Sequence, residues 1–124
     1  MNDVYINDKP LNACNGTKCK LVIDTGTSII TAPSNYVYEI IKNIPFSNCD
    51  EIHGNPKISF KIGDLYLEMF PEDYMIKPNR LVTSSLIEKN SSNLRFKNIS
   101  YNENCKKGFM PLDVEPPRGP IWVL

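Results

Sequence analysis

Residues 20–28 read Lys20-Leu21-Val22-Ile23-Asp24-Thr25-Gly26-Thr27-Ser28, an apolar run that ends in a carboxylate, a glycine and several hydroxyl side chains. The run Lys20–Ile23 is compact and rich in β-branched residues, which predicts a buried strand. Gly26 lets the backbone approach the Asp24 carboxylate closely, and the neighbouring hydroxyls can hold that carboxylate in one orientation. The same residues also fit an ordinary Asx turn after a strand, so a catalytic and a structural interpretation both stay open here.

Length and composition narrow the classes of protein to consider. The chain has 124 residues, which suits one domain or one lobe of a larger protein. Its 14 basic and 14 acidic side chains balance, so there is no basic field for a nucleic-acid partner. The apolar fraction of 41% is enough for a core, yet no apolar run reaches the roughly 20 residues of a membrane span. A single histidine argues against a His-rich metal site.

The cysteines and the glycosylation triplets favour the secretory pathway. Four cysteines allow three disulfide pairings, and their spacing alone does not choose among them. A zinc site would more often show two short cysteine pairs, whereas this chain has one short gap. Acceptor triplets for N-glycosylation begin at Asn15, Asn90 and Asn98. The cysteines are Cys14, Cys19, Cys49 and Cys105.

The flanking segments predict mostly strands and one helix. Asp3 to Lys9 reads as a strand that runs into an Asn/Asp turn. Pro33-Ser34 offers a helix start with Ser34 as the N-cap, and Pro45 ends the helix. The apolar residues at helical spacing are Val37, Ile40, Ile41 and Ile44.

The second half of the chain changes to a period of two. Lys57 to Phe70 alternates apolar and polar residues around Gly63-Asp64, which predicts a β-hairpin. Pro71 to Ile76 can supply another short strand, and residues 77–104 read as a surface insertion. Two further strand-like runs lie at Gly108–Val114 and Ile121–Leu124. The expected fold class is therefore mainly β with one clear helix.

Taken in order, these segments resemble the C-terminal lobe of the pepsin-like aspartic proteases, closest to the cathepsin D and plasmepsin branch. Only the Asp24–Ser28 run is diagnostic by itself, but the ordered set is very specific and covers most of the chain. The resemblance implies that residues 1–124 form a partial C-terminal lobe of a bilobal protease, ending before the family's closing strands. The set comprises Cys14-x4-Cys19, Lys20–Ser28, Thr31–Ser34, Cys49, Lys57–Gly63, Tyr74–Ile76, Cys105-x2-Gly108-Phe109-Met110 and Gly119–Leu124.

The resemblance also implies the chemistry. Asp24 matches the second of two catalytic aspartates, which share a proton and act on a water molecule and a peptide carbonyl. Thr25 matches a threonine whose hydroxyl reaches the partner lobe, and Gly26 lets the backbone N–H face the carboxylates. Thr27 matches the side chain that bonds the outer aspartate oxygen or the substrate backbone. The mechanism needs no cofactor and no metal.

Further positions follow from the same resemblance. Residues that match substrate-pocket positions, although plain core packing is an equal alternative for each, are Val22, Leu112, Val114 and Val123. Trp122 is expected in the core. The implied disulfides are Cys14–Cys19 and Cys49–Cys105.

The chain carries one Asp-Thr-Gly where the family's chemistry requires two, and the family's flap tyrosine is also absent. The expected partners are a peptide or protein substrate and an N-terminal lobe of the same protease, in the secretory pathway, an acidic vesicle or vacuole, or outside the cell. One alternative is a homodimer of the retroviral-protease kind. Another is a non-catalytic lobe that serves as a binding or antigen module.

Overall fold

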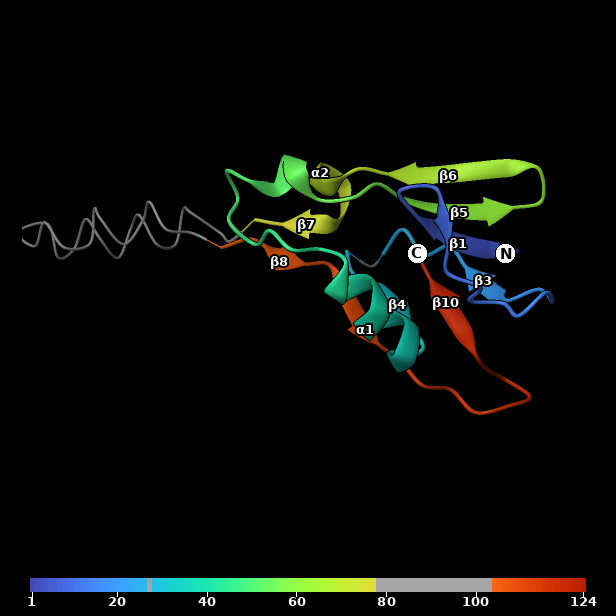
Figure 1. Ribbon diagram of the computed structural model, residues 1–124. Helices are drawn as coiled ribbons and strands as arrows, with labels where there is room; N and C mark the ends of the chain where they lie inside the picture. Colours follow the sequence, from blue (N-terminus) through green and yellow to red (C-terminus); the bar gives the residue numbers. More distant parts are fainter. Residues whose placement is uncertain (27, 78–103) are drawn as a thin grey trace, which may run out of the picture.

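A computed structural model describes residues 1–26, 28–77 and 104–124. Its first sheet is antiparallel, in the order β2-β1-β5-β6, and lies along the top of the molecule in Figure 1. The predicted strand and turn at 3–9 are confirmed, because Asn7 and Asp8 take positive φ values of 47° and 67° between two short strands. The predicted hairpin is confirmed as well. The strands are β1 (Asp3–Ile6), β2 (Lys9–Pro10), β5 (Ile58–Ile62) and β6 (Leu65–Met69).

The second sheet has a crossed order, β3-β10-β4-β9. Its strands are β3 (Lys20–Val22), β4 (Ile30–Ala32), β9 (Phe109–Pro111) and β10 (Ile121–Val123). β10 runs parallel to β3 and antiparallel to β4, so it lies between two strands that the 23–29 segment connects (Figure 1). A small third sheet pairs β7 (Met75–Ile76) with β8 (Lys106–Lys107).

The clear helix is α1 (Ser34–Lys42), which contacts β4 and β9. The N-cap prediction is wrong, because Pro33 holds the N-cap position and Ser34 is the first helical residue. The backbone N–H of Ser34 has a hydrogen-bond partner outside the helix, because it donates to Oδ1 of Asp113 at 2.9 Å. The helix ends at Lys42, before Pro45, and the buried apolar side chains of this region are Val37, Ile40 and Ile44.

The prediction of a strand at 71–76 is confirmed only for its last two residues. Its first part is a single helical turn, α2 (Pro71–Tyr74), and only Met75–Ile76 pairs as a strand. Pro71 suits the first helical position, and the carboxylate of Asp73 accepts the N–H of Phe70 at 2.8 Å. A 3₁₀ turn, η1 (Ile52–Gly54), contacts α2.

The core forms where the two sheets and α1 meet. Trp122 is fully buried, as expected, with ring centroids of Phe60 and Tyr36 at 6.1 and 5.9 Å. Tyr74 is buried too, and its hydroxyl donates to the Pro56 carbonyl at 2.7 Å. Its hydroxyl is therefore satisfied, as a buried polar group requires.

The prediction that Lys20–Ile23 is buried is wrong. β3 is the edge strand of its sheet, and Val22 keeps 47% of its surface exposed, with Ile23 more exposed still. The predicted strand at 108–114 is also shorter, since β9 ends at Pro111. The predicted insertion at 77–104 lies outside the described residues except for its two end residues.

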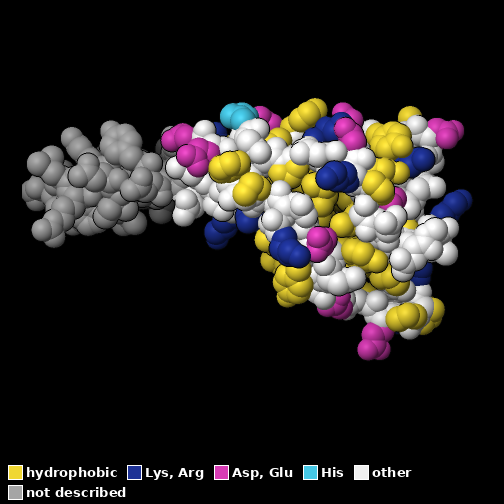
Figure 2. Space-filling model, viewed as in Figure 1, with side chains coloured by type: hydrophobic (Ala, Val, Ile, Leu, Met, Phe, Trp, Pro, Cys, Tyr) yellow, Lys and Arg dark blue, Asp and Glu magenta, His cyan; other side chains and the backbone are white. Residues whose placement is uncertain are grey.

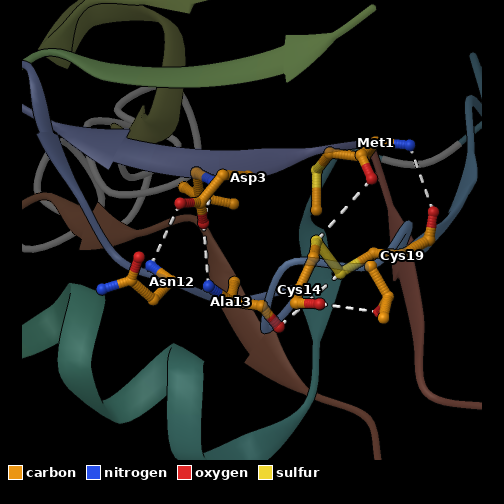
Figure 3. Close-up of a disulfide and its surroundings, with 8 residues drawn as sticks. Met1, Asp3, Asn12, Ala13, Cys14 and Cys19 are labelled. Atoms are coloured by element: carbon orange, nitrogen blue, oxygen red, sulfur yellow. Dashed lines mark hydrogen bonds between the residues drawn. A yellow bond between two sulfur atoms is a disulfide. The ribbon is translucent and has the colours of Figure 1, made fainter.

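Both implied disulfides are present, with Cα–Cα distances of 5.3 Å for Cys14–Cys19 and 5.1 Å for Cys49–Cys105. The first lies beside the N-terminus (Figure 3), where Met1 and Cys19 exchange backbone hydrogen bonds of 3.1 and 2.9 Å. The carboxylate of Asp3 accepts N–H groups from Ala13 at 2.8 Å and Asn12 at 3.2 Å. The loop ahead of β3 is therefore fixed by covalent and hydrogen bonds together.

Among the described residues, no helix has the length and apolar character to cross a membrane. The described part of the chain likewise contains no group of three or more His, Cys, Asp or Glu side chains that could hold a metal ion.

Candidate active site

Asp24 stands where β3 gives way to the segment that leads to β4. Its backbone N–H donates to the Leu124 carbonyl at 2.7 Å, and the Leu124 N–H donates to the Val22 carbonyl at 2.9 Å. These bonds continue the parallel pairing of β3 with β10 by one residue at each strand. The backbone position of Asp24 is therefore set by a strand that lies about a hundred residues further along the chain.

The Asp24 carboxylate is oriented by its own turn. Oδ1 accepts the backbone N–H of Gly26 at 2.9 Å, which is the Asx arrangement expected of this residue. A Cβ atom at position 26 would lie 3.2 Å from the same oxygen, so glycine leaves the carboxylate the space it occupies. Asp24, Thr25 and Gly26 are all exposed, so water and a substrate can reach the acid.

The hydroxyl residues of the motif are only partly described. Thr27 lies outside the described residues. Ser28 is exposed and borders a hollow of about 330 Å³. Other residues of that hollow come from both sheets and from α2, namely Ile29, Ile30, Met69, Asp73, Tyr74, Gly108 and Leu124. A larger hollow of about 450 Å³ lies by the Cys14–Cys19 loop, and its lining contains no carboxylate.

Strand register brings two of the expected pocket residues together. Val22 pairs directly with Val123, Val123 with Thr31, and Thr31 with Met110. This row crosses the whole second sheet, and opposite residues on neighbouring strands share a face. Trp122 is the neighbour of Val123 in sequence and points into the core, so the row faces away from the core. Beside the Asp24 turn, the sheet therefore presents a partly exposed apolar surface.

The other two expected pocket residues differ from each other. Leu112 continues the line of β9, because its N–H donates to the Ala32 carbonyl at 2.7 Å, and its side chain is exposed. Val114 instead packs against Gly119, where its carbonyl leaves no room for a side chain. The strand pairings do not place Val114 in the row.

Sequence reasoning missed two members of this region. Met110 is half-exposed and lies in the row, and its sequence signal is only that it follows Phe109, which is buried, in a strand. Asp113 accepts the N–H of Ser34, and this backbone bond, with a second from the Ser34 hydroxyl, lowers the pKa of the Asp113 carboxyl. No local pattern signals that bond, because its partners are 79 residues apart.

Comparison with known proteins agrees with this geometry. A family model for eukaryotic aspartyl proteases matches residues 1–124. Plasmepsin VI of Plasmodium berghei (strain Anka) is 33% identical over 126 residues, which cover 97% of this chain and 25% of that protein. Cathepsin D of Bos taurus is 30% identical over 92% of the chain and 26% of its own length, and Napsin-A of Homo sapiens is 32% identical over 86% and 23%. The chain thus spans about a quarter of the length of these relatives.

Proposed function

The chain belongs to the eukaryotic aspartyl protease family, and from this premise we propose that it supplies Asp24 as the second catalytic aspartate of an acid endopeptidase. The observation that carries the proposal is the setting of Asp24. Its backbone is clamped to β10 through Leu124, while its carboxylate is exposed and oriented by the Gly26 N–H. A residue whose backbone is held by hydrogen bonds and whose carboxylate is exposed suits a group that must contact a substrate.

The proposed reaction is hydrolysis of a peptide bond without a covalent intermediate. Asp24 and an aspartate from the N-terminal lobe share one proton, because two adjacent carboxylates cannot both ionise cheaply. The ionised carboxylate takes a proton from a water molecule as the water attacks the peptide carbonyl. The protonated carboxylate donates its proton to the developing oxyanion. The carboxyl group that took the proton from water then gives it to the leaving nitrogen, and the C–N bond breaks. One hydroxyl of the intermediate returns its proton to the other carboxylate, which restores the dyad with its single shared proton.

The residues after Asp24 support this arrangement in distinct ways. Gly26 places its N–H on the carboxylate and leaves room for Oδ1. Thr25 is exposed and adjacent, so its hydroxyl can bind a second lobe. Thr27 is proposed to bind the outer aspartate oxygen or the substrate backbone, on the strength of the family motif alone.

The proposed substrate is an extended peptide whose apolar side chains contact the row beside Asp24. Val22, Val123 and Met110 supply that surface, and Leu112 extends it along β9. We also propose Val114 as a substrate-pocket residue, and the family resemblance is the only support for it. The chain's partner in this function is the N-terminal lobe, which would bring the other aspartate.

The proposed compartment is the secretory pathway or an acidic vesicle. Both pairs of cysteines are joined as disulfides, and such bonds persist where the surroundings are oxidising. The acid working range follows from the shared proton of the dyad, which requires that one carboxylate stays protonated.

The first test separates the lobe from the complete protease. We expect the 124-residue chain alone not to cleave a peptide at acidic pH, even at high protein concentration, because it carries one Asp-Thr-Gly. The measurement is cleavage of a fluorogenic peptide across a dilution series. Cleavage that rises with the square of protein concentration and is blocked by pepstatin would instead support a homodimer of the retroviral kind.

The second test addresses the parent protein. We expect it to cleave peptides at acidic pH and to lose that activity when Asp24→Ala is introduced. A parent protein that folds and shows no cleavage with Asp24 intact would favour a non-catalytic binding module.

A further inference from the structure

β6 forms one edge of the first sheet, and none of the described strands pairs with its outer side. Ile62 and Leu65 flank the two-residue turn, so the backbone N–H and C=O groups of these two residues bond each other. Hydrogen-bonded pairs alternate along an antiparallel ladder, so the backbone groups of Leu67 and Met69 also point towards β5. The Lys61 carbonyl accepts the N–H of Asn2 and so points towards β1, which agrees with this alternation. The N–H and C=O groups of Tyr66 and Glu68 therefore point outwards. Among the described residues, no backbone hydrogen bond joins them to another segment.

This edge lacks the features that usually prevent strands from pairing. Residues 65–69 contain no proline, no lysine and no bulge, and they pair in continuous register with β5. Leu65 is 74% exposed and Leu67 is 44% exposed, although both lie on the same face as the buried Phe60. Figure 2 shows hydrophobic side chains interspersed with charged ones along the upper rim of the molecule, where β6 runs.

We propose that the outer edge of β6 pairs antiparallel with β6 of a second copy of this chain, with Leu67 opposite the partner's Leu67. A twofold axis at Leu67 sets Leu65 against the partner's Met69 and Tyr66 against the partner's Glu68. The aliphatic side chains of both strands, Leu65, Leu67 and Met69, then share one face. The outward groups of Tyr66 bond those of the partner's Glu68, so the two sheets become one continuous sheet.

Charge selects this register over its neighbours. A twofold axis at Tyr66 would set Asp64 opposite the partner's Glu68, and an axis at Glu68 would set that carboxylate opposite its own copy. Like charges directly opposite each other on paired strands are destabilising. A shift by one residue would place the leucines on the opposite face from the partner's leucines. Of the registers compared, the one centred on Leu67 avoids both penalties.

The ion pairs of the sheet are compatible with this pairing. Glu68 already binds Nζ of Lys57 at 2.8 Å, and Nζ of Lys61 lies 5.7 Å from the ring centre of Tyr66. Both contacts are made on the face opposite the leucines, so they persist when the strands pair. The contact is small, which predicts association in the micromolar range or weaker.

The pairing does not involve the proposed catalytic residue. Asp24 follows β3 in the other sheet, so the proposal stands or fails independently of protease activity. It also differs from a dimer of the retroviral kind, which would join the Asp24 turns.

The test combines sedimentation with amide hydrogen exchange on the 124-residue chain across a wide range of concentration. We expect a dimer to form with rising concentration, and the amides of Tyr66 and Glu68 to gain protection in parallel. The amides of Leu65 and Leu67 bond β5 in either state and serve as internal controls. A chain that stays monomeric throughout would overturn the proposal, as would a dimer in which Tyr66 and Glu68 still exchange freely.

A matched pair of variants tests the backbone bonds directly. Glu68→Pro removes an outward N–H at a position where an edge strand tolerates proline, and Glu68→Gln removes the same charge but keeps that N–H. We expect Glu68→Pro to weaken dimerisation by about tenfold or more relative to Glu68→Gln. Equal dimerisation of two folded variants would contradict the proposal. If circular dichroism shows that Glu68→Pro is unfolded, the exchange measurement on the unaltered chain decides.

Discussion

Backbone groups contribute to the position and the orientation of the Asp24 side chain. Gly26 donates its N–H to Oδ1, and the Leu124 carbonyl holds the Asp24 N–H. A substitution at Gly26 therefore acts through the space and the backbone shape that it imposes. The consequence is that a small side chain at the wrong position can disturb the acid while the fold persists.

Gly26→Ala tests this dependence in the parent protease. The new Cβ would lie 3.2 Å from Oδ1 of Asp24, closer than ordinary contact, so the carboxylate must shift by a few tenths of an ångström. We expect kcat/KM to fall by about tenfold or more, with little loss of folding stability, because the turn is exposed. Steady-state cleavage and a urea titration of the same variant measure the two quantities.

Gly63→Ala is the matched control. Gly63 has a φ of +61° in the hairpin turn and open space around it, so alanine strains the backbone there without touching Asp24. We expect it to cost about 1 kcal/mol of stability and to leave the cleavage rate per folded molecule unchanged. If both glycine variants lost activity and stability alike, the proposed role of Gly26 would be contradicted.

At the level of elements, the carboxylate of Asp113 joins the segment after β9 to the start of α1. Oδ1 of Asp113 accepts the N–H of Ser34, an orphan donor at the start of α1. Because Asp113 follows Leu112, this bond also fixes the chain beside the apolar row. A carboxylate near a helix N-terminus is favoured in its charged form.

Asp113→Asn tests that charge. The folded pKa of Asp113 is lowered, so the carboxylate contributes stability above its unfolded pKa of about 3.9, and this contribution is lost as pH falls through the folded value. We expect the variant to unfold at a lower urea concentration than the unaltered chain at pH 7, and the two to converge below about pH 4. Midpoints measured from pH 3 to pH 7 provide the comparison, and a gap that widens towards acid would contradict the assignment.

Elements set by local pattern could be predicted, and those set by distant partners could not. The 57–70 hairpin follows from alternation and a Gly-Asp turn, and the structure confirms it. The exposure of Val22 could not be foreseen, because an edge strand is defined by sheet order and not by composition. The prediction of Ser34 as the N-cap is wrong because the Ser34 N–H binds Asp113, which is distant in sequence and which no local pattern indicates.

At the level of the whole molecule, the described residues share one hydrophobic core cluster, which contains Trp122 and a buried cysteine of each disulfide. The motif and the family resemblance together predict Asp24 as a site residue, and the resemblance implies both disulfide pairings, which the structure confirms. Met110 joined the apolar row only through strand register, and Val114 did not join it. The sequence therefore indicates the candidate residues that lie in one short motif, and it does not indicate those that crossed strands bring together.

The two disulfides should differ in what they contribute. In the chain-entropy model, a loop of the length closed by Cys49–Cys105 is worth about 4 kcal/mol, and one closed by Cys14–Cys19 about 2 kcal/mol. We expect Cys49→Ala/Cys105→Ala to lower the free energy of unfolding more than Cys14→Ala/Cys19→Ala does. Urea unfolding of the two double variants measures this, and the reverse order would show that the short loop supports more of the native structure.

The central claim, that Asp24 is a catalytic aspartate, is tested most directly by an isosteric change in the full-length parent. Asp24→Asn keeps the shape of the side chain and removes its charge, while Asp64→Asn does the same at the exposed hairpin turn. Cleavage of a peptide at acidic pH should fall by about a thousandfold or more in Asp24→Asn and stay unchanged in Asp64→Asn. Undiminished cleavage by a folded Asp24→Asn protein would contradict the account.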